Sequence, residues 1–146
     1  MDRFDTSRDE LTVGGLPLPL LAERVGQTPF YAYDRSLIAA RIRAVRQVVP
    51  HKVHLHYALK ASPMPALVSF VRPLVDGMDV ASAGELKLAL DAGADPQSIG
   101  FSGPGKRDAE LRQAVAAGAL LHAESERELR VLAAAAQLVG RADRVA

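Results

Sequence analysis

The sequence predicts an α/β fold that forms the N-terminal half of a (β/α)8, or TIM-type, barrel. Three observations support this prediction. Apolar β-type runs alternate with helical segments four times in succession after residue 50. The ends of these runs lie about 21 residues apart, which fits a strand, a tight loop, a helix of three turns and a return. No antiparallel hairpin signal such as Asn-Gly interrupts the series, so we expect parallel strands.

A parallel sheet of four or five strands also occurs in an open, doubly wound fold. Small residues at the strand ends and short loops after the strands favour the barrel. A complete barrel needs about 250 residues, whereas this chain has 146. We therefore expect about half a barrel, whose last strand begins at Arg144-Val145-Ala146 and is cut at its start. The edge left there would promote association.

The predicted organisation has three parts. A polar lead is expected to be flexible, a turn-rich connecting segment contains a short strand, and the barrel portion follows. The boundaries of these parts are, in order, 1–10, 11–33 and 34–146. In the connecting segment we expect a short helix over residues 20–25 and the strand over residues 28–33, where aromatic and β-forming residues cluster.

The barrel portion is predicted to begin with a helix from Arg35 to about Val49. Asp34 is a favourable N-cap, apolar side chains fall on one stripe of the helix, and Pro50 ends it. Four strand–helix pairs follow. Their strands are expected at 53–58, 77–81, 98–101 and 119–123, and their helices at 64–72, 83–92, 107–117 and 125–139.

The composition excludes several kinds of function. Hydrophobic residues make up 49% of the chain, as in a globular domain, and a net charge of +1 gives no field that would attract nucleic acid. Because the chain has no cysteine, disulfides, zinc–thiolate sites and cysteine nucleophiles are excluded within it. No apolar run approaches the roughly 18 to 20 residues of a membrane span. We therefore expect a cytoplasmic protein that binds neither nucleic acid nor membrane and holds no metal.

Lys60 ends the first predicted strand of the barrel portion, at the edge where α/β folds place their chemistry. Alone, it would be read as a solvated residue that closes the strand. The other strands bring acids, a hydroxyl and a histidine to the same edge, which makes Lys60 a candidate for Schiff-base chemistry. These further candidates are Asp79, Glu85, Ser102 and His122. The amine must lose its proton before it attacks an aldehyde, and nearby acids shuttle that proton. Glu85 also fits a structural role in the first turn of a helix.

Two further motifs are weaker. Residues 100–106 have the G-x-x-x-x-G-K spacing of a phosphate-binding loop, but Arg107 stands where Ser or Thr should hold magnesium. We expect a tight turn there. His54 and His56 alternate on one face of the predicted strand. Without a third ligand, they are interpreted as residues of the core or of the barrel lumen.

Four motifs occur in order along the chain and carry a resemblance to a known family. They read Tyr-Ala-Leu-Lys-Ala-Ser at 57–62, Gly-Met-Asp-Val-Ala-Ser-Ala-Gly-Glu-Leu at 77–86, Phe-Ser-Gly-Pro-Gly-Lys at 101–106 and Glu-Ser-Glu at 124–126. With Thr-Pro-Phe-Tyr-Ala-Tyr-Asp at 28–34, they resemble the pyridoxal-phosphate-dependent decarboxylases of the alanine-racemase-like fold, fold type III. The chain is most similar to the diaminopimelate/ornithine decarboxylase family, and within it to the members associated with exosortase systems.

The resemblance implies that Lys60 forms the Schiff base with pyridoxal 5'-phosphate and that Asp79 and Glu85 lie beside this lysine and the cofactor. The implied enzyme is a carboxy-lyase that removes the α-carboxylate of a small amino-acid substrate, with the cofactor as electron sink. A homodimer is implied for the full-length family member. The chain departs from the family at Ser62, since the motif after the lysine usually reads Lys-Ala-Asn.

Length is the larger departure, because members of the family are much longer and include a C-terminal β domain. The family's histidine stacked on the cofactor, its glycine-rich phosphate loop and its acid facing the pyridine nitrogen come later in the barrel. We therefore expect the N-terminal barrel portion of such an enzyme, truncated before the β domain, with no useful turnover on its own. Two alternatives stay open, a non-catalytic decarboxylase-like regulator or cofactor carrier, and a racemase on the same scaffold. The sequence does not give the substrate.

Overall fold

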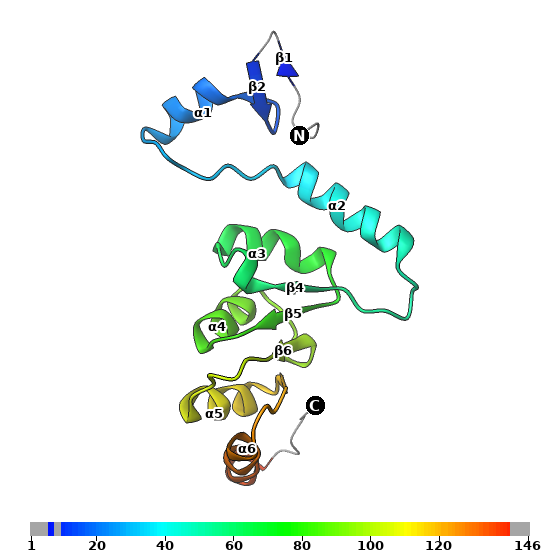
Figure 1. Ribbon diagram of the computed structural model, residues 1–146, viewed down its shortest axis with the longest axis vertical. Helices are drawn as coiled ribbons and strands as arrows, with labels where there is room; N and C mark the ends of the chain where they lie inside the picture. The colour runs from blue at the N-terminus through cyan, green and yellow to red at the C-terminus, as the bar shows by residue number, and fades with distance from the viewer. Residues whose placement is uncertain (1–5, 8–9, 141–146) are drawn as a thin grey trace. The chain divides into compact units, whose positions relative to one another are not determined.

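The computed structural model describes residues 6–7 and 10–140, and the chain divides into two compact units, Met1–Val49 and Pro50–Ala146. The first unit contains a three-stranded antiparallel sheet in the order β1-β2-β3, followed by two helices (Figure 1). Its elements are β1 Thr6–Ser7, β2 Glu10–Val13, β3 Leu16–Pro17, α1 Leu18–Val25 and α2 Arg35–Val48. The turn between β2 and β3 consists of Gly14 and Gly15, both at positive φ, as a two-residue hairpin requires.

The helices of the first unit confirm the prediction, and its strands do not. Asp34 caps α2 by accepting hydrogen bonds from the backbone N–H groups of Ser36 and Leu37. Parts of the predicted flexible lead belong to strands, since Thr6–Ser7 pairs with a strand that begins at Glu10. Residues 28–33 form no strand, although their side chains favour one, because no neighbouring strand pairs with their backbone. The predicted boundaries of the three parts stay predictions.

The second unit contains a four-stranded parallel sheet in the order β4-β5-β6-β7. Each strand is followed by a helix, as predicted. The strands are β4 His56–Ala58, β5 Gly77–Val80, β6 Ile99–Phe101 and β7 Leu120–Leu121. The helices are α3 Pro65–Val71, α4 Ala83–Asp91, α5 Asp108–Ala117 and α6 Glu126–Val139, with 3₁₀ turns η1 Leu59–Ala61, η2 Arg72–Leu74 and η3 Pro96–Ser98. The strand predicted at Arg144 lies outside the described residues.

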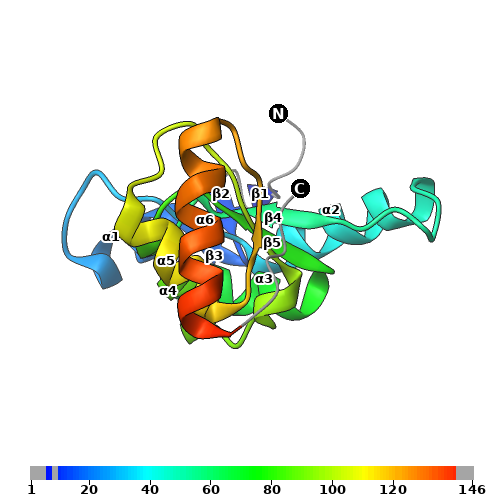
Figure 2. The ribbon, with the colours of Figure 1, turned by 90° about the horizontal axis from the view of Figure 1, so that it is seen from below.

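Within residues 50–140 the helices cover one face of the sheet, and α5 and α6 pack side by side (Figures 1 and 2). Alternate strand residues on that face are buried against them. The largest members of this core are Leu59, Val68, Met78, Val80, Leu86, Ile99, Phe101, Leu111, Leu121 and Leu132. Helices on a single face are typical of a barrel wall and not of a doubly wound sheet, so the arrangement agrees with the predicted barrel portion.

The strand predicted over residues 53–58 is shorter than expected. β4 begins only at His56, because Asp76 ties down the residue before it: its carboxylate accepts a hydrogen bond from the backbone N–H of Leu55 at 2.7 Å. β4 ends at Ala58, where the predicted strand ends, and Lys60 lies in the 3₁₀ turn η1 that follows it. Among the described residues, no helix is both long enough and apolar enough to cross a membrane.

Glu110 joins the N-termini of two neighbouring helices. Its carboxylate accepts hydrogen bonds from the backbone N–H groups of Ala83, at the start of α4, and Arg107, the N-cap of α5, both at 3.0 Å. The Arg107 side chain donates to the same carboxylate at 3.2 Å. This side-chain bond, and then the two backbone bonds, lower the pKa of Glu110 from 4.5 to about 2.

We expect Glu110→Gln to lower the free energy of unfolding at neutral pH by about 1 kcal/mol, a modest value because the exposed Arg107 partner is screened by water. The pKa of Glu110 is depressed in the folded state, so its stabilisation is complete above 4.5 and disappears as the pH falls towards 2. Urea unfolding of both proteins at about pH 7 and about pH 3 measures this. The exposed Glu126→Gln serves as control, and a Glu110→Gln deficit that is unchanged at the lower pH would contradict the assignment.

Candidate functional site

The carboxyl ends of the parallel strands meet at one edge of the sheet, and the predicted site residues lie there. Ala58, Asp79 and Gly100 are direct neighbours across β4, β5 and β6. Lys60 lies two residues beyond Ala58, Ser102 directly follows β6, and His122 directly follows β7. Residues 58, 79 and 100 therefore share one face, which we call the inner face: the face of the β4–β7 sheet opposite helices α3 to α6.

Lys60 differs from the other lysines of the chain. Its side chain is exposed, and among residues 6–7 and 10–140 its ammonium has no hydrogen-bonding or ion-pair partner. Lys87 pairs with Asp91 on α4 at 2.6 Å, and Lys106 is buried among carboxylates. Lys52 is also exposed but precedes the sheet. Lys60 is thus an accessible amine at the functional edge, and the chain has only four lysines in all.

Asp79 lies on the inner face, and His56 holds one of its oxygens. Nδ1 of His56 lies 3.0 Å from Oδ1 of Asp79, and the two side chains are 29% and 49% exposed. An ionised carboxylate only accepts hydrogen bonds, so the Nδ1 atom carries the proton of this bond. His54, in contrast, precedes β4 and is exposed. The sequence interpretation treats the two histidines alike, whereas the structure places His56 beside Asp79 and leaves His54 exposed.

The remaining candidates have distinct surroundings. Glu85 accepts a hydrogen bond from the Ala81 backbone N–H at 2.7 Å, while the Ser82 hydroxyl accepts one from the Glu85 backbone at 3.2 Å. Glu85 thus performs the structural task of an acid in the first turn of α4. Ser102 is exposed, and its backbone N–H donates to Val80 at 3.0 Å. The active-site roles of these residues stay predictions.

His122 continues the ladder beyond β7, because its backbone N–H donates to the carbonyl of Phe101 at 3.0 Å. Its ring faces Gly100 on the inner face. A Cβ atom at Gly100 would lie 3.4 Å from Nε2 of His122 and 3.0 Å from Oδ1 of Asp79. The structure therefore brings His122 and Asp79 to the same glycine.

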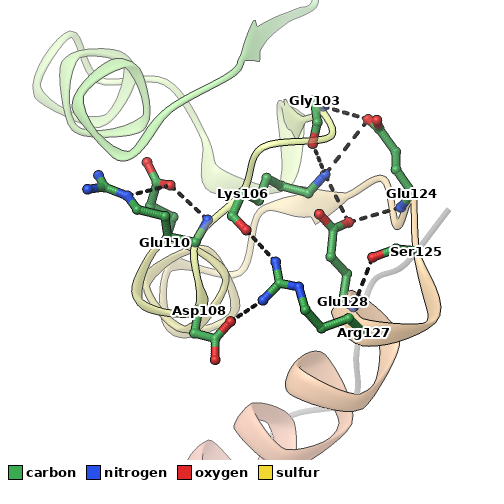
Figure 3. Close-up of polar contacts among 9 residues, drawn as sticks. Gly103, Lys106, Asp108, Glu110, Glu124, Ser125, Arg127 and Glu128 are labelled. Carbon is green, nitrogen blue, oxygen red and sulfur yellow. Dashed lines mark hydrogen bonds and ion pairs between the residues drawn. The ribbon is translucent and has the colours of Figure 1, made fainter.

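A buried lysine dominates the polar contacts beside this edge (Figure 3). The Lys106 side chain is 0% exposed, and its ammonium donates to the carbonyl of Gly103 at 2.5 Å. It lies 3.1 Å from Oε2 of Glu128, whose side chain is 1% exposed, and 3.7 Å from Oε1 of Glu124. The other oxygen of Glu128, Oε1, is buried and has no hydrogen-bond partner among the described residues. We call these four residues the Lys106 cluster.

The Lys106 cluster joins two loops at the carboxyl edge of the sheet. Gly103, after β6, donates its N–H to Glu124, after β7, at 2.5 Å, and the Glu124 N–H donates to Glu128 on α6 at 2.9 Å. Arg127 on α6 donates to the carbonyl of Lys106 at 2.7 Å. Gly103 has a φ of 120°, so the tight turn predicted at residues 100–106 is confirmed. Its N–H is already engaged by a carboxylate, which argues against a phosphate cradle at this glycine.

Sequence reasoning missed the Lys106 cluster. The phosphate-loop spacing and the motif at residues 101–106 both contain Lys106, but neither indicates a buried ion pair, and Glu128 is one acid among several on a helix. The available signal was the charge of Lys106 in a loop between two apolar segments, with an acid at the first turn of the next helix. No group of three or more His, Asp or Glu side chains in the described part of the chain is arranged to hold a metal ion.

Comparison with known proteins identifies relatives for most of this chain. A family model described as "Pyridoxal-dependent decarboxylase, pyridoxal binding domain" matches residues 35–142. The diaminopimelate decarboxylase of Aquifex aeolicus (strain VF5) is 39% identical over 138 residues, which cover 94% of this chain and 32% of that protein. Diaminopimelate decarboxylase of Pseudomonas aeruginosa is 37% identical over 142 residues, 96% of this chain and 34% of that protein.

Solved structures also match this chain. The crystal structure of diaminopimelate decarboxylase from Helicobacter pylori complexed with L-lysine matches with a TM-score of 0.78 and 33% identity, over 87% of this chain and 33% of that chain. AQ1208 from Aquifex aeolicus matches with a TM-score of 0.90 and 37% identity, over 98% of this chain and 36% of that chain. The predicted family and the barrel portion are confirmed. The chain spans about a third of the length of these relatives.

The Lys106 cluster gives a stability prediction. Lys106→Met leaves the Glu128 carboxylate buried without its cation, and we expect the free energy of unfolding to fall by about 3 to 5 kcal/mol. Lys106→Met combined with Glu128→Leu removes both charges and should recover part of that loss, although the Glu124 N–H loses its acceptor. Urea unfolding measures the three proteins.

Lys87→Met is the matched control, because Lys87 forms an exposed pair with Asp91 whose loss costs about 0.5 kcal/mol or less. A double variant that is less stable than Lys106→Met alone would show that an unpaired charge is not the cause of the loss.

Proposed function

The chain belongs to the pyridoxal-dependent decarboxylase family, and from this premise we propose that it is the cofactor-binding barrel portion of an amino-acid decarboxylase that uses pyridoxal phosphate. Lys60 is the residue proposed to hold the cofactor covalently. The observation that supports this assignment is an exposed lysine without a partner among the described residues, two positions beyond the neighbour of Asp79 in the sheet.

The donor set around Lys60 fits the aldehyde end of the cofactor. Reaction with an aldehyde requires a free amine, and the amine of Lys60 forms no ion pair among the described residues. The phosphate end requires free backbone or cationic donors, and Gly103 in the nearby glycine loop does not offer its N–H for this purpose. The residues described here therefore fit covalent attachment, and the N–H of Gly103 is not available for the phosphate.

Bound pyridoxal phosphate supplies an electron sink that allows the α-carboxylate of an amino acid to leave. The task of the chain is to present a deprotonated amine at the correct place. Lys60 supplies the amine, and Asp79 supplies a carboxylate on the inner face that accepts its proton. Because Asp79 is held by His56 at 3.0 Å, it is already oriented before any ligand arrives.

The substrate class follows from the relatives. Two relatives that match more than nine tenths of the chain are diaminopimelate decarboxylases, and one solved relative is complexed with L-lysine. We propose a small amino acid with a second polar end, and diaminopimelate is the first compound to test. A homodimer, a cytoplasmic location and the grouping with exosortase-associated members remain proposals on the resemblance alone.

Borohydride reduction in the presence of pyridoxal phosphate tests the cofactor assignment. We expect the pyridoxyl label on the peptide that contains Lys60, because this amine is accessible and unpaired. Lys60→Arg should abolish the label, and Lys52→Arg, which removes the other exposed lysine without an ion pair, should leave it unchanged. Label that divides evenly between Lys52 and Lys60 would overturn the assignment.

Turnover is measured separately, as carbon dioxide released from diaminopimelate. The sequence leads us to expect none from these 146 residues alone. Release above the Lys60→Arg background would contradict that expectation. Label on Lys60 without any release from a longer form of the protein would favour the alternative of a non-catalytic cofactor carrier.

A further inference from the structure

Three side chains with titratable groups form a row on the inner face of the sheet. His56, Asp79 and His122 come from β4, β5 and the position after β7. Two glycines lie on the same face between them: Gly77 is the direct neighbour of His56, and Gly100 that of Asp79. With Gly100 of β6 between Asp79 and His122, the row crosses the sheet from β4 to the end of β7, and its β4 member His56 precedes Lys60 in the chain.

The two glycines provide the space that the row occupies. A Cβ atom at Gly77 would lie 2.6 Å from both Cε1 and Nε2 of His56, so the imidazole ring rests directly on this glycine. At Gly100, a Cβ atom would lie 3.0 Å from Asp79 Oδ1 and 3.4 Å from His122 Nε2. Any side chain at either position would displace a member of the row.

The hydrogen bond fixes both the tautomer of His56 and the direction of the Asp79 carboxylate. His56 donates from Nδ1 to Oδ1 of Asp79, because the ionised carboxylate has no proton to give. His122 lies beside the same glycine, since its Nε2 and Oδ1 of Asp79 are 3.4 Å and 3.0 Å from the Cβ position of Gly100. Oδ2 of Asp79 has no hydrogen-bond partner among the described residues and is left for another donor.

We propose that His56 is a positioning residue for Asp79: with His122 on the other side, it holds Oδ1 so that Oδ2 is presented to the amine of Lys60. This inference rests on the proposed function, in which Asp79 accepts the proton of Lys60. His56 acts through Asp79 and touches neither cofactor nor substrate. The two glycines belong to the device because they admit the imidazole ring and the carboxylate.

The geometry can be tested without cofactor. Long-range ¹H–¹⁵N correlation spectra of the whole chain report the tautomer of each histidine ring. We expect His56 to be held as the Nδ1–H tautomer and to lose this preference in Asp79→Ala. The exposed His54 is the internal control. A His56 ring with the same tautomer mixture as His54 would overturn the proposal, whether or not Lys60 binds the cofactor.

Two substitutions at one position test the effect on Lys60. In His56→Asn the amide nitrogen takes the place of Nδ1 and keeps the donor, whereas in His56→Gln it lies one bond further out. We expect the rate of borohydride-trapped labelling of Lys60 to stay close to wild type in His56→Asn and to fall about tenfold in His56→Gln, the effect of one lost hydrogen bond. In Gly100→Ala, whose added Cβ crowds Asp79, the labelling rate of Lys60 should fall by a similar factor.

Thermal unfolding of each variant confirms that the fold is retained. Equal labelling rates in His56→Asn and His56→Gln would overturn the positioning role, even with the expected tautomer. If wild-type Lys60 takes no label at all, the proposed function fails, and the tautomer of His56 still decides whether the row exists.

Discussion

The alternation of side chains across the β4–β7 sheet is the constraint on which both the core and the site depend. Residues such as Met78 and Phe101 point to the helices and are almost fully buried. Their neighbours Asp79 and Gly100 point to the inner face. A shift of one residue in β5 would turn the Asp79 carboxylate towards the helices, and a shift of one residue in β6 would turn the Phe101 ring away from them, which the core would not tolerate. The apolar half of each strand therefore fixes the register that lines up His56, Asp79 and Gly100.

The Lys106 cluster connects the loops that follow β6 and β7, beyond the edge of the sheet. Strand pairing ends at Phe101 and Leu121, so the loops that follow have no ladder of their own. A buried ammonium between Glu128 and the carbonyl of Gly103 ties these loops together at defined distances. A buried ion pair is weak evidence for a large contribution to folding stability, since well-packed apolar residues in its place often give an equally stable protein. Its contribution is geometric, because one ammonium contacts Gly103 after β6 and both Glu124 and Glu128 after β7.

Much of the second unit was predictable from local chemistry. The period of about 21 residues, the Ser82 and Ser125 N-caps and the Gly118 and Gly140 ends locate α4, α5 and α6 to within a residue or two. The first unit was harder, because the strand predicted at residues 28–33 has the right residues but no partner. The Gly14-Gly15 pair is a hairpin signal of another type than Asn-Gly, and it forms the turn between β2 and β3.

Within the site, the sequence predicted which residues reach the edge and not which of them touch. The pairing of His56 with Asp79 depends on the register between β4 and β5 and on the space at Gly77. The spacing of apolar residues along the sequence predicts neither of these. The hydrogen bond from the Ala81 N–H to the Glu85 carboxylate likewise could not be predicted from spacing. Contacts between strands are set by packing of the whole sheet, so they lie beyond what spacing along one chain can determine.

The contrast between Lys60 and Lys106 shows why position at the functional edge is not sufficient for carbonyl chemistry. Both follow a strand of the same sheet, and Lys106 lies among carboxylates. The ammonium of Lys106 is enclosed, donates to a carbonyl at 2.5 Å and faces Glu128 at 3.1 Å, so an aldehyde has no path to it. Lys60 is exposed and has no hydrogen-bonding or ion-pair partner among the described residues, and Asp79 is engaged at one oxygen by His56. An accessible amine without an ion pair can attack an aldehyde, whereas an enclosed ammonium cannot.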